Sequence, residues 1–204
     1  SLQMLEENYF WTVVKGKKIF YALDTFFQAN LAILPDLISH IEDLKLWNKD
    51  TVLFDIYGGV GLFGICFYDK VAAVSLIEEN VHAIKLAQYN VQFHQAKNFG
   101  IIEGKVEERL MPLLDDGIAL EKGAHCVAII DPPRQGLSGQ VVETLLNASA
   151  KMDKILYLSC NPVSLVRDLG FLTASSRWQI DQIIPFDFFP RTQHMETLVV
   201  MSPY

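Results

Sequence analysis

A continuous apolar run that leads into a glycine-rich segment is the feature of this sequence that most restricts its fold. Residues 51–56 predict a buried β-strand with Asp55 near its end, and the sequence YGGVG follows at 57–61. A strand, a glycine-rich turn and a helix in this order form the first unit of a nucleotide-binding α/β sheet. Because glycine has no Cβ, Gly59 and Gly61 allow the backbone to approach a ligand closely.

A second strand ends in an acid at the distance expected for such a unit. Residues 72–77 are mostly apolar, and Glu78 follows them. A carboxylate at this position accepts hydrogen bonds from the ribose hydroxyls of a bound nucleoside. Glu78 would also complement the dipole of the helix expected at 81–93, which is the simpler alternative. The glycine-rich turn and the acid together favour a bound nucleoside cofactor.

A fourth strand ends in a charged residue followed by two prolines. Residues 126–130 are continuously apolar, as in a parallel strand that is buried on both faces, and Asp131-Pro132-Pro133-Arg134 follows. The prolines predict a rigid, extended exit from the strand. A buried carboxylate without a partner is costly, so we expect Asp131 to have one.

A cysteine follows the next predicted strand. Residues 155–158 form a short apolar run, and Cys160 comes just before Pro162, a residue that suits the first turn of a helix. The thiol is therefore expected at the carboxyl edge of the sheet, near the positive end of a helix dipole, which lowers a thiol pKa. Taken by itself, this segment also allows Cys160 to be a small buried hydrophobic residue.

The remaining periodicities complete an α/β pattern. Gln28 and Asn30 precede a helix and, by themselves, indicate a polar turn that caps it. Further helices and strands are expected from the apolar spacing. Two hairpins are expected, one pairing 9–14 with 17–23 and one pairing 178–184 with 196–201. The expected helices are 31–46, 81–93, 106–114, 138–150 and one from Pro162 to about 172. A third strand of the sheet is expected at 99–103.

Composition restricts the class of protein further. Half of the 204 residues are hydrophobic and 20% are charged, which favours a well-filled core over disorder. Cys66, Cys126 and Cys160 form no CxxC pair, which argues against a disulfide framework or a metal centre and fits a reducing cytoplasm. No apolar run reaches the roughly 18 residues of a membrane span. The net charge of −7 is unfavourable for binding nucleic acid, so an RNA ligand would need a local basic groove or a partner domain.

With these motifs assembled, the chain resembles the RNA uracil-5-methyltransferases, which use S-adenosylmethionine to form 5-methyluridine. The motifs that carry the resemblance are FFQAN from Phe26, DIYGGVGLFG from Asp55, IEEN from Ile77, DPPRQGL from Asp131, LSCNPVSLVRD from Leu158 and DFFPRTQHMET from Asp187. The combination is specific, because many methyltransferases share the glycine-rich loop but lack SCNP with a later HxE. The resemblance implies a Rossmann-like class I methyltransferase fold: a mostly parallel seven-stranded sheet, helices on both faces and a C-terminal antiparallel hairpin.

The resemblance also implies roles for individual residues. Cys160 matches the nucleophile of the family, and Glu196 matches its base. The positions that match the S-adenosylmethionine site, together with the glycines of the loop, are Gln28, Tyr57, Gly59, Gly61, Glu78 and Asp131. Asp131 is also expected near the target uracil, no metal ligand is implied, and the roles of Arg134 and His194 stay open.

The expected substrate is a flipped uridine in RNA, with 23S ribosomal RNA favoured over transfer RNA. Residues 1–204 are expected to form one domain, with an entry hairpin and the FFQAN segment at 1–30 and a Rossmann-like core at 31–204. Family members usually carry an RNA-binding barrel at their N-terminus, and we expect this chain to lack it. We expect a cytoplasmic monomer without a membrane anchor.

The chemistry of uracil agrees with these roles. C5 of uracil is a poor nucleophile, and addition of a thiolate to C6 activates C5 before a base removes the C5 proton. Two alternatives stay open. An amino-methyltransferase acting on adenine or guanine also carries an acid or amide before two prolines and needs no thiol. A non-catalytic module would bind S-adenosylmethionine without transferring its methyl group.

Overall fold

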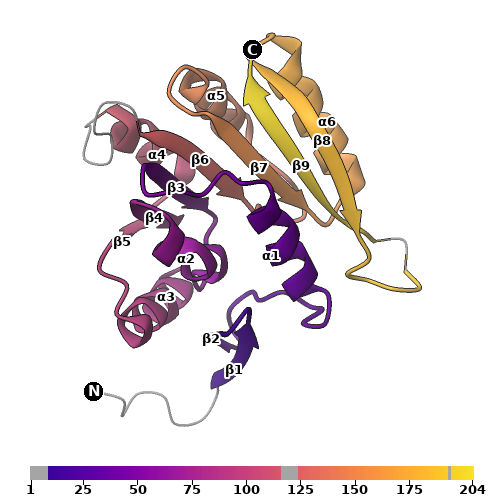
Figure 1. The fold of residues 1–204 in the computed structure, drawn as a ribbon. Coiled ribbons are helices and arrows are strands. Elements are labelled where there is room, and N and C mark those ends of the chain that lie inside the picture. Colours follow the sequence, from indigo (N-terminus) through magenta and orange to yellow (C-terminus); the bar gives the residue numbers. More distant parts are fainter. Residues whose placement is uncertain (1–8, 116–123, 193) are drawn as a thin grey trace.

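The computed structural model describes residues 9–115, 124–192 and 194–204, so the first eight residues of the predicted 1–30 segment lie outside it. Seven strands form one sheet in the order β5-β4-β3-β6-β7-β9-β8 (Figure 1). The elements are β1 Tyr9–Val14, β2 Lys17–Ala22, α1 Leu34–Asp43, β3 Thr51–Ile56, α2 Leu62–Phe67, η2 Tyr68–Lys70, β4 Ala73–Glu78, α3 Val81–His94, β5 Phe99–Glu103, α4 Val106–Asp115, β6 His125–Ile130, α5 Gly139–Ala148, β7 Lys154–Ser159, α6 Pro162–Ala174, β8 Trp178–Phe186 and β9 Glu196–Pro203.

The direction of the strands is that of a Rossmann-like methyltransferase sheet. β3, β4, β5, β6 and β7 pair in parallel, whereas β9 runs antiparallel to both of its neighbours, β7 and β8. The predicted α/β fold, with a mostly parallel seven-stranded sheet and a C-terminal antiparallel hairpin, is confirmed.

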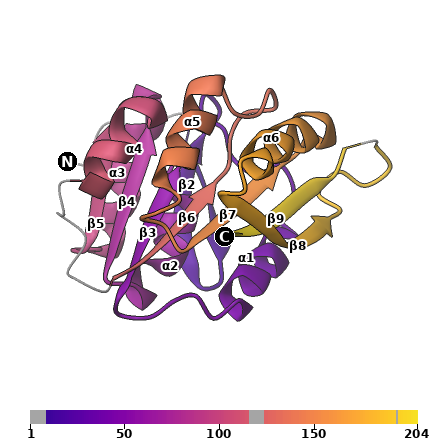
Figure 2. The same cartoon turned by 90° about the horizontal axis from the view of Figure 1, so that it is seen from above.

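Side chains that alternate in direction along the central strands divide the core into two layers, one on each face of the sheet. Successive side chains of a strand point to opposite faces of the sheet. In β3, Leu53 packs with α1 and α2, whereas Phe54 packs with α4, α5 and α6. In β7, Leu156 and Tyr157 divide between the same two clusters. Figure 2 shows α1 and α2 on one side of the sheet and α5 and α6 on the other.

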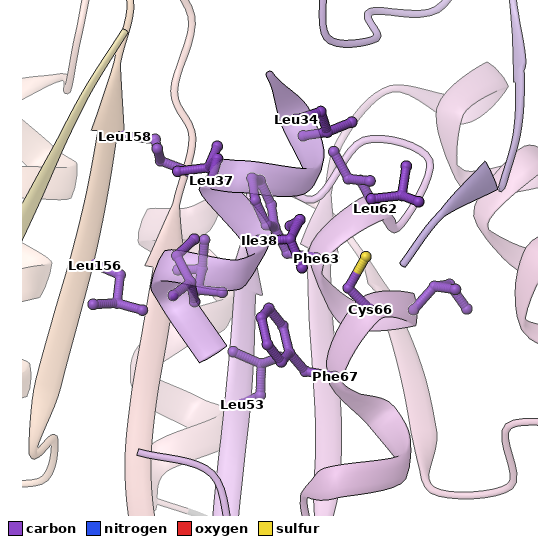
Figure 3. Packing of buried hydrophobic residues seen from close by; sticks show 14 of the residues in the cluster. Leu34, Leu37, Ile38, Leu53, Leu62, Phe63, Cys66, Phe67, Leu156 and Leu158 are labelled. Atoms are coloured by element: carbon purple, nitrogen blue, oxygen red, sulfur yellow. The ribbon is translucent and has the colours of Figure 1, made fainter. Parts of the chain in front are cut away.

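The layer that contains α1 is closely packed. The buried residues of this helix recur at intervals of three and four, which gives one apolar face: Leu34, Leu37, Ile38 and Ile41. Figure 3 shows Leu37 and Ile38 between Leu158 of β7 and Phe63 of α2. This packing fixes the segment that leads from the N-terminal hairpin into the sheet.

The first helix is shorter than predicted. Residues 31–46 were expected to be helical, but α1 comprises Leu34–Asp43. Its N-cap residue is Ile33, which makes no capping hydrogen bond through its side chain. The interpretation of Gln28 and Asn30 as helix-capping residues is therefore wrong. Gln28 donates to Asp131, and Asn30 bonds to Phe188 and to Ala32 in the turn that precedes the helix.

One buried amide joins the N-terminal hairpin to the sheet. Asn90 of α3 is fully buried. Its Nδ2 donates to the carbonyl oxygens of Phe20 (3.0 Å) and Val60 (2.9 Å), and its Oδ1 accepts the N–H of Phe20 (2.9 Å). Since Phe20 lies in β2 and Val60 in the glycine-rich segment, Asn90 holds the hairpin and that segment together.

We predict that Asn90→Ala lowers the free energy of unfolding by about 2–3 kcal/mol, because it leaves partly buried backbone groups of Phe20 and the buried carbonyl oxygen of Val60 without partners. Urea denaturation followed by circular dichroism measures this change. Gln92→Ala, on the exposed part of the same helix, is the control and is expected to change stability by no more than about 0.5 kcal/mol. Equal stability of the Asn90 variant and the parent would contradict the role assigned to this amide.

Candidate active site

The ends of several strands meet at one edge of the sheet. Parallel strands end at the same edge, so the segments after β3, β4, β6 and β7 converge there. β9 runs the other way, so its first residue, Glu196, lies at that edge too. Ser159 pairs with Thr197, and the next step of this antiparallel register sets Cys160 opposite Glu196. The structure thus brings the two predicted catalytic residues together.

Glu196 is a buried carboxyl group with an unused oxygen. The residue is 3% exposed, and its Oε1 finds no hydrogen-bond partner among the residues that the structure describes. Burial raises the pKa of Glu196 to about 8, and the negative charge of Asp131 acts in the same direction. Because an unpaired polar atom in the interior is costly, this oxygen is available to a ligand or a transferable proton.

Asp131 has the partner that its position requires. Gln28 Nε2 donates a hydrogen bond of 2.8 Å to Asp131 Oδ2, although the two residues are 103 positions apart. Burial raises the pKa of Asp131 to about 7, and the hydrogen bond from Gln28 opposes the rise. The expectation that Asp131 is paired is confirmed, and its partner is the predicted site residue Gln28.

Cys160 lies directly before α6, as predicted. Asn161 is the N-cap residue of this helix, and its side chain accepts the N–H of Val163 (3.1 Å). Burial raises the pKa of the Cys160 thiol, the charge of Glu196 raises it further, and the Arg134 guanidinium beside it opposes both effects. The predicted lowering of the thiol pKa is therefore wrong, because burial and neighbouring carboxylates outweigh the start of α6.

The glycine-rich segment has the backbone of a ligand-binding turn. Tyr57, Gly59 and Gly61 have φ values of +58°, +53° and +85°, in the left-handed region. A Cβ built on Gly59 would meet no atom within 4 Å, so the space beside this residue is open. The N–H of Gly59 donates to Glu78 Oε2 (2.9 Å), which places the carboxylate next to that space.

Backbone groups hold Glu78 in place. Its Oε1 accepts the N–H groups of Glu79 (2.9 Å) and Asn80 (2.8 Å), in addition to the bond between Oε2 and Gly59. Asn80, and not Glu78, caps α3 by accepting the N–H of His82 (2.9 Å). Glu78 is therefore a preorganised acceptor at the end of β4.

A cavity of about 410 Å³ opens beside this acceptor. Its wall consists of Tyr57, the end of β4, residues 104–107 before and in α4, Pro133 and residues 135–138 after β6, and Arg167 of α6. This volume lies in the range of small-molecule sites, about 300–1,000 Å³. Tyr57 and Glu78 line the cavity, whereas Gln28, Asp131, Cys160 and Glu196 form the acid–thiol cluster outside its lining.

Two fully buried aspartates near the site, Asp55 and Asp168, were not predicted from the sequence to be part of it. Asp55 Oδ2 accepts the N–H of Gly64 (2.8 Å), and burial raises the pKa of Asp55 to about 8. Asp168 lies on the buried face of α6 with Leu165 and Leu169. The sequence does contain a signal for Asp168. It is a charged residue at a position where the helical pattern places apolar residues, and a buried charge needs a specific partner.

The two motif residues whose roles were open lie in different places. The Arg134 guanidinium lies beside the Cys160 thiol. His194 is exposed, and its N–H donates to Thr192 Oγ1 (3.1 Å). Only Arg134 of the two contacts the acid–thiol cluster in this structure.

Residues 9–115, 124–192 and 194–204 contain neither a cluster of metal-ligating side chains nor a helix that could span a membrane. Within these ranges, no group of three or more His, Cys, Asp or Glu side chains is placed to hold a metal ion. None of the helices in the same ranges combines the length and the apolar character that a bilayer crossing requires.

Comparison with known families gives one match over nearly the whole chain. The model described as tRNA (uracil-5-)-methyltransferase matches residues 3–203. An uncharacterised RNA methyltransferase of Thermosynechococcus vestitus is 31% identical over 95% of this chain, and one of Enterococcus faecalis is 30% identical over 87%. The matched regions are 41% and 37% of those proteins, so the chain spans about two-fifths of the length of these curated relatives.

A solved structure resembles the chain as well. The Pyrococcus abyssi tRNA (uracil-54, C5)-methyltransferase, in complex with S-adenosyl-L-homocysteine, superimposes with a TM-score of 0.76 and 26% sequence identity. The similarity covers 96% of this chain and 44% of the P. abyssi chain. Together with the sheet order, this similarity confirms the Rossmann-like methyltransferase fold.

We predict that Gln28→Leu raises the pKa of Asp131 above its value of about 7, because the hydrogen bond from Gln28 stabilises the charged carboxylate. Titration of ¹³C-labelled aspartate carboxyl groups by NMR measures the shift. Gln140→Leu, an exposed change on α5, is the control and is expected to leave the Asp131 titration where it is. A titration of Asp131 that moves to lower pH in the Gln28 variant would contradict the assigned effect.

Proposed function

The chain belongs to the tRNA (uracil-5-)-methyltransferase family, and we propose that it transfers a methyl group from S-adenosylmethionine to C5 of a uridine in RNA. One observation carries this proposal: the strand register sets Cys160 opposite Glu196, whose buried Oε1 has no partner among the described residues. A nucleophile and a base on adjacent strands are the two groups that C5 methylation of uracil requires.

The residues of the cavity fit S-adenosylmethionine. Glu78 is held as an acceptor for ribose hydroxyls, and the open space at Gly59 admits a ligand against the backbone. Tyr57 lines the cavity, and Gly61 would act by shaping the turn, because a Cβ there would meet Leu76. Gln28 with Asp131 would hold the part of the cofactor nearest Cys160. S-adenosylmethionine supplies an electrophilic methyl group when bound. The complex of the P. abyssi enzyme with S-adenosyl-L-homocysteine supports this choice of cofactor.

In the proposed mechanism, the Cys160 thiolate adds to C6 of the uracil ring. The S–C6 bond forms, and the electrons of the C5=C6 double bond move toward C5 and O4, which makes C5 nucleophilic. The Arg134 guanidinium beside Cys160 favours the thiolate and opposes the effect of burial. Asp131, one strand away, would orient the uracil by accepting its N3–H.

Glu196 acts after C5 has received its methyl group. Its carboxylate removes the C5 proton, the electrons of the C5–H bond restore the C5=C6 double bond, and Cys160 leaves C6 as a thiolate. The unpaired Oε1 and the pKa of about 8 suit Glu196 for this task, because the group exchanges a proton near neutral pH.

The substrate that we propose is a uridine extruded from its RNA helix. The preference for 23S ribosomal RNA over transfer RNA stays a prediction. The family description and the P. abyssi enzyme both refer to transfer RNA, so methylation assays need both kinds of RNA. Mass spectrometry of 5-methyluridine in each product decides between them.

We predict that Cys160→Ala lowers turnover by about a thousandfold or more, because no other group can add to C6. Affinity for S-adenosyl-L-homocysteine, measured by calorimetry, is expected to stay close to that of the parent, since Cys160 does not line the cavity. Cys126→Ala removes a buried thiol of β6 and is the matched control, with turnover retained. Full activity of the Cys160 variant would rule out the nucleophile assignment and favour an amino-methyltransferase.

We predict that Glu196→Gln accumulates a covalent complex between the protein and methylated RNA, because the C5 proton then stays in place and Cys160 cannot leave. Denaturing gel electrophoresis detects the complex, and Glu143→Gln, an exposed change on α5, is the control. For the parent, kcat/KM is expected to rise as the pH rises through about 8, since Glu196 becomes charged in that range. A Glu196 variant that turns over without a trapped complex would exclude Glu196 as the base.

A further inference from the structure

One buried carboxylate of α6 holds the loop that forms part of the cavity wall. Asp168 is fully buried, and four hydrogen bonds reach its two oxygens. Oδ2 accepts the N–H of Leu137 (2.8 Å) and the hydroxyl of Tyr157 (2.6 Å). Oδ1 accepts Nε (2.9 Å) and Nη2 (2.7 Å) of Arg167. The mechanism proposed above uses none of these three side chains.

The loop is shaped to fit this carboxylate. Gly136 has a φ of +76°, and a Cβ built on it would lie 2.3 Å from Asp168 Oδ2. Only glycine therefore allows the backbone to approach so closely. Arg167 Nη2 also donates to the carbonyl oxygens of Gln135 (2.8 Å) and Leu137 (3.2 Å), so the charged pair contacts three successive residues of the cavity wall.

The same loop is joined to the turn that carries Cys160. The carbonyl oxygen of Arg134 accepts hydrogen bonds from Asn161 Nδ2 (3.0 Å) and Ser164 Oγ (3.0 Å). Asn161 directly follows Cys160 and caps α6, the helix that bears Asp168. Residues 134–137 and the turn at Cys160 therefore form one hydrogen-bonded unit with the first two turns of α6.

We propose that Asp168 is a positioning residue, whose carboxylate holds residues 135–137 of the cavity wall and, through them, sets the adjoining Arg134 beside Cys160. This inference rests on the proposed function, because it assigns the cavity to the cofactor and Cys160 to the chemistry. Asp168 is buried, but the side chain of its ion-pair partner Arg167 is 47% exposed, so the charge pair itself contributes little stability. Its hydrogen bonds to one loop instead determine where that loop lies.

The test compares Asp168→Ala and Tyr157→Phe with the parent chain. We expect Asp168→Ala to weaken binding of S-adenosyl-L-homocysteine about tenfold in calorimetry. A change of this size corresponds to the loss of about one hydrogen bond, here one that orders the loop. The second readout is the pH profile of Cys160 alkylation by iodoacetamide, followed by peptide mass spectrometry; Cys66 and Cys126 are buried. Its midpoint is expected to move to higher pH, because the Arg134 guanidinium is no longer held beside the thiol.

Tyr157→Phe keeps the proposal testable if Asp168→Ala does not fold. It keeps the shape of a fully buried side chain and removes one of the hydrogen bonds to Asp168, so smaller changes in the same two directions are expected. The matched control is Asp153→Ala, whose carboxylate accepts the N–H of Cys126 (2.7 Å) at the amino-terminal edge of the sheet. This control is expected to lower the melting temperature and leave both readouts unchanged.

Folded variants of Asp168 and Tyr157 that match the parent in both readouts would overturn the proposal. A lower melting temperature with unchanged readouts, as for Asp153→Ala, would also overturn it by showing a structural role alone. Failure of the proposed function is recognised separately, since the parent would then form no 5-methyluridine in either kind of RNA, whether or not it binds S-adenosyl-L-homocysteine. In that case a shifted alkylation profile in Asp168→Ala still supports the positioning of Arg134 by Asp168.

Discussion

The candidate site depends on the antiparallel pairing of β9 with β7. A sixth parallel strand would begin at the opposite edge of the sheet, about 20 Å from the end of β7 for a strand of six residues. Because β9 runs the other way, its first residue, Glu196, reaches the edge at which β7 ends, and the register sets it opposite Cys160. The direction of one strand thus decides whether a thiol and a carboxyl group can act on the same ring.

The carboxyl groups at this edge differ in their hydrogen bonds, and these differences separate their chemical roles. Glu78 accepts three backbone N–H groups and is a fixed acceptor beside the cavity. Asp131 has one amide partner, and Glu196 has an oxygen without a partner among the described residues. Burial raises the pKa of both Asp131 and Glu196 toward neutrality. In the proposed mechanism, these different environments suit Glu78 to hold a ligand and Glu196 to carry a proton.

Glycine has two distinct uses in the walls of the site. At Gly59 the missing Cβ leaves open space beside Glu78, which suits a ligand. At Gly136 the missing Cβ leaves room for a protein group, the carboxylate of Asp168. The first glycine allows the ligand to approach the backbone, and the second allows the cavity wall to be bound to α6. Both are consequences of close backbone approach.

The sequence by itself determined the order of strands and helices, because apolar runs and helical spacing are local properties of the chain. It also identified the strand-end residues Glu78, Asp131 and Cys160, since the ends of parallel strands share one edge. Only the tertiary structure decided which of these groups meet and how they ionise. The bond from Gln28 to Asp131 spans 103 positions, and the raised pKa of Cys160 reflects burial and charges on other strands. Pairing and desolvation depend on residues far apart in the chain, so no local pattern contains them.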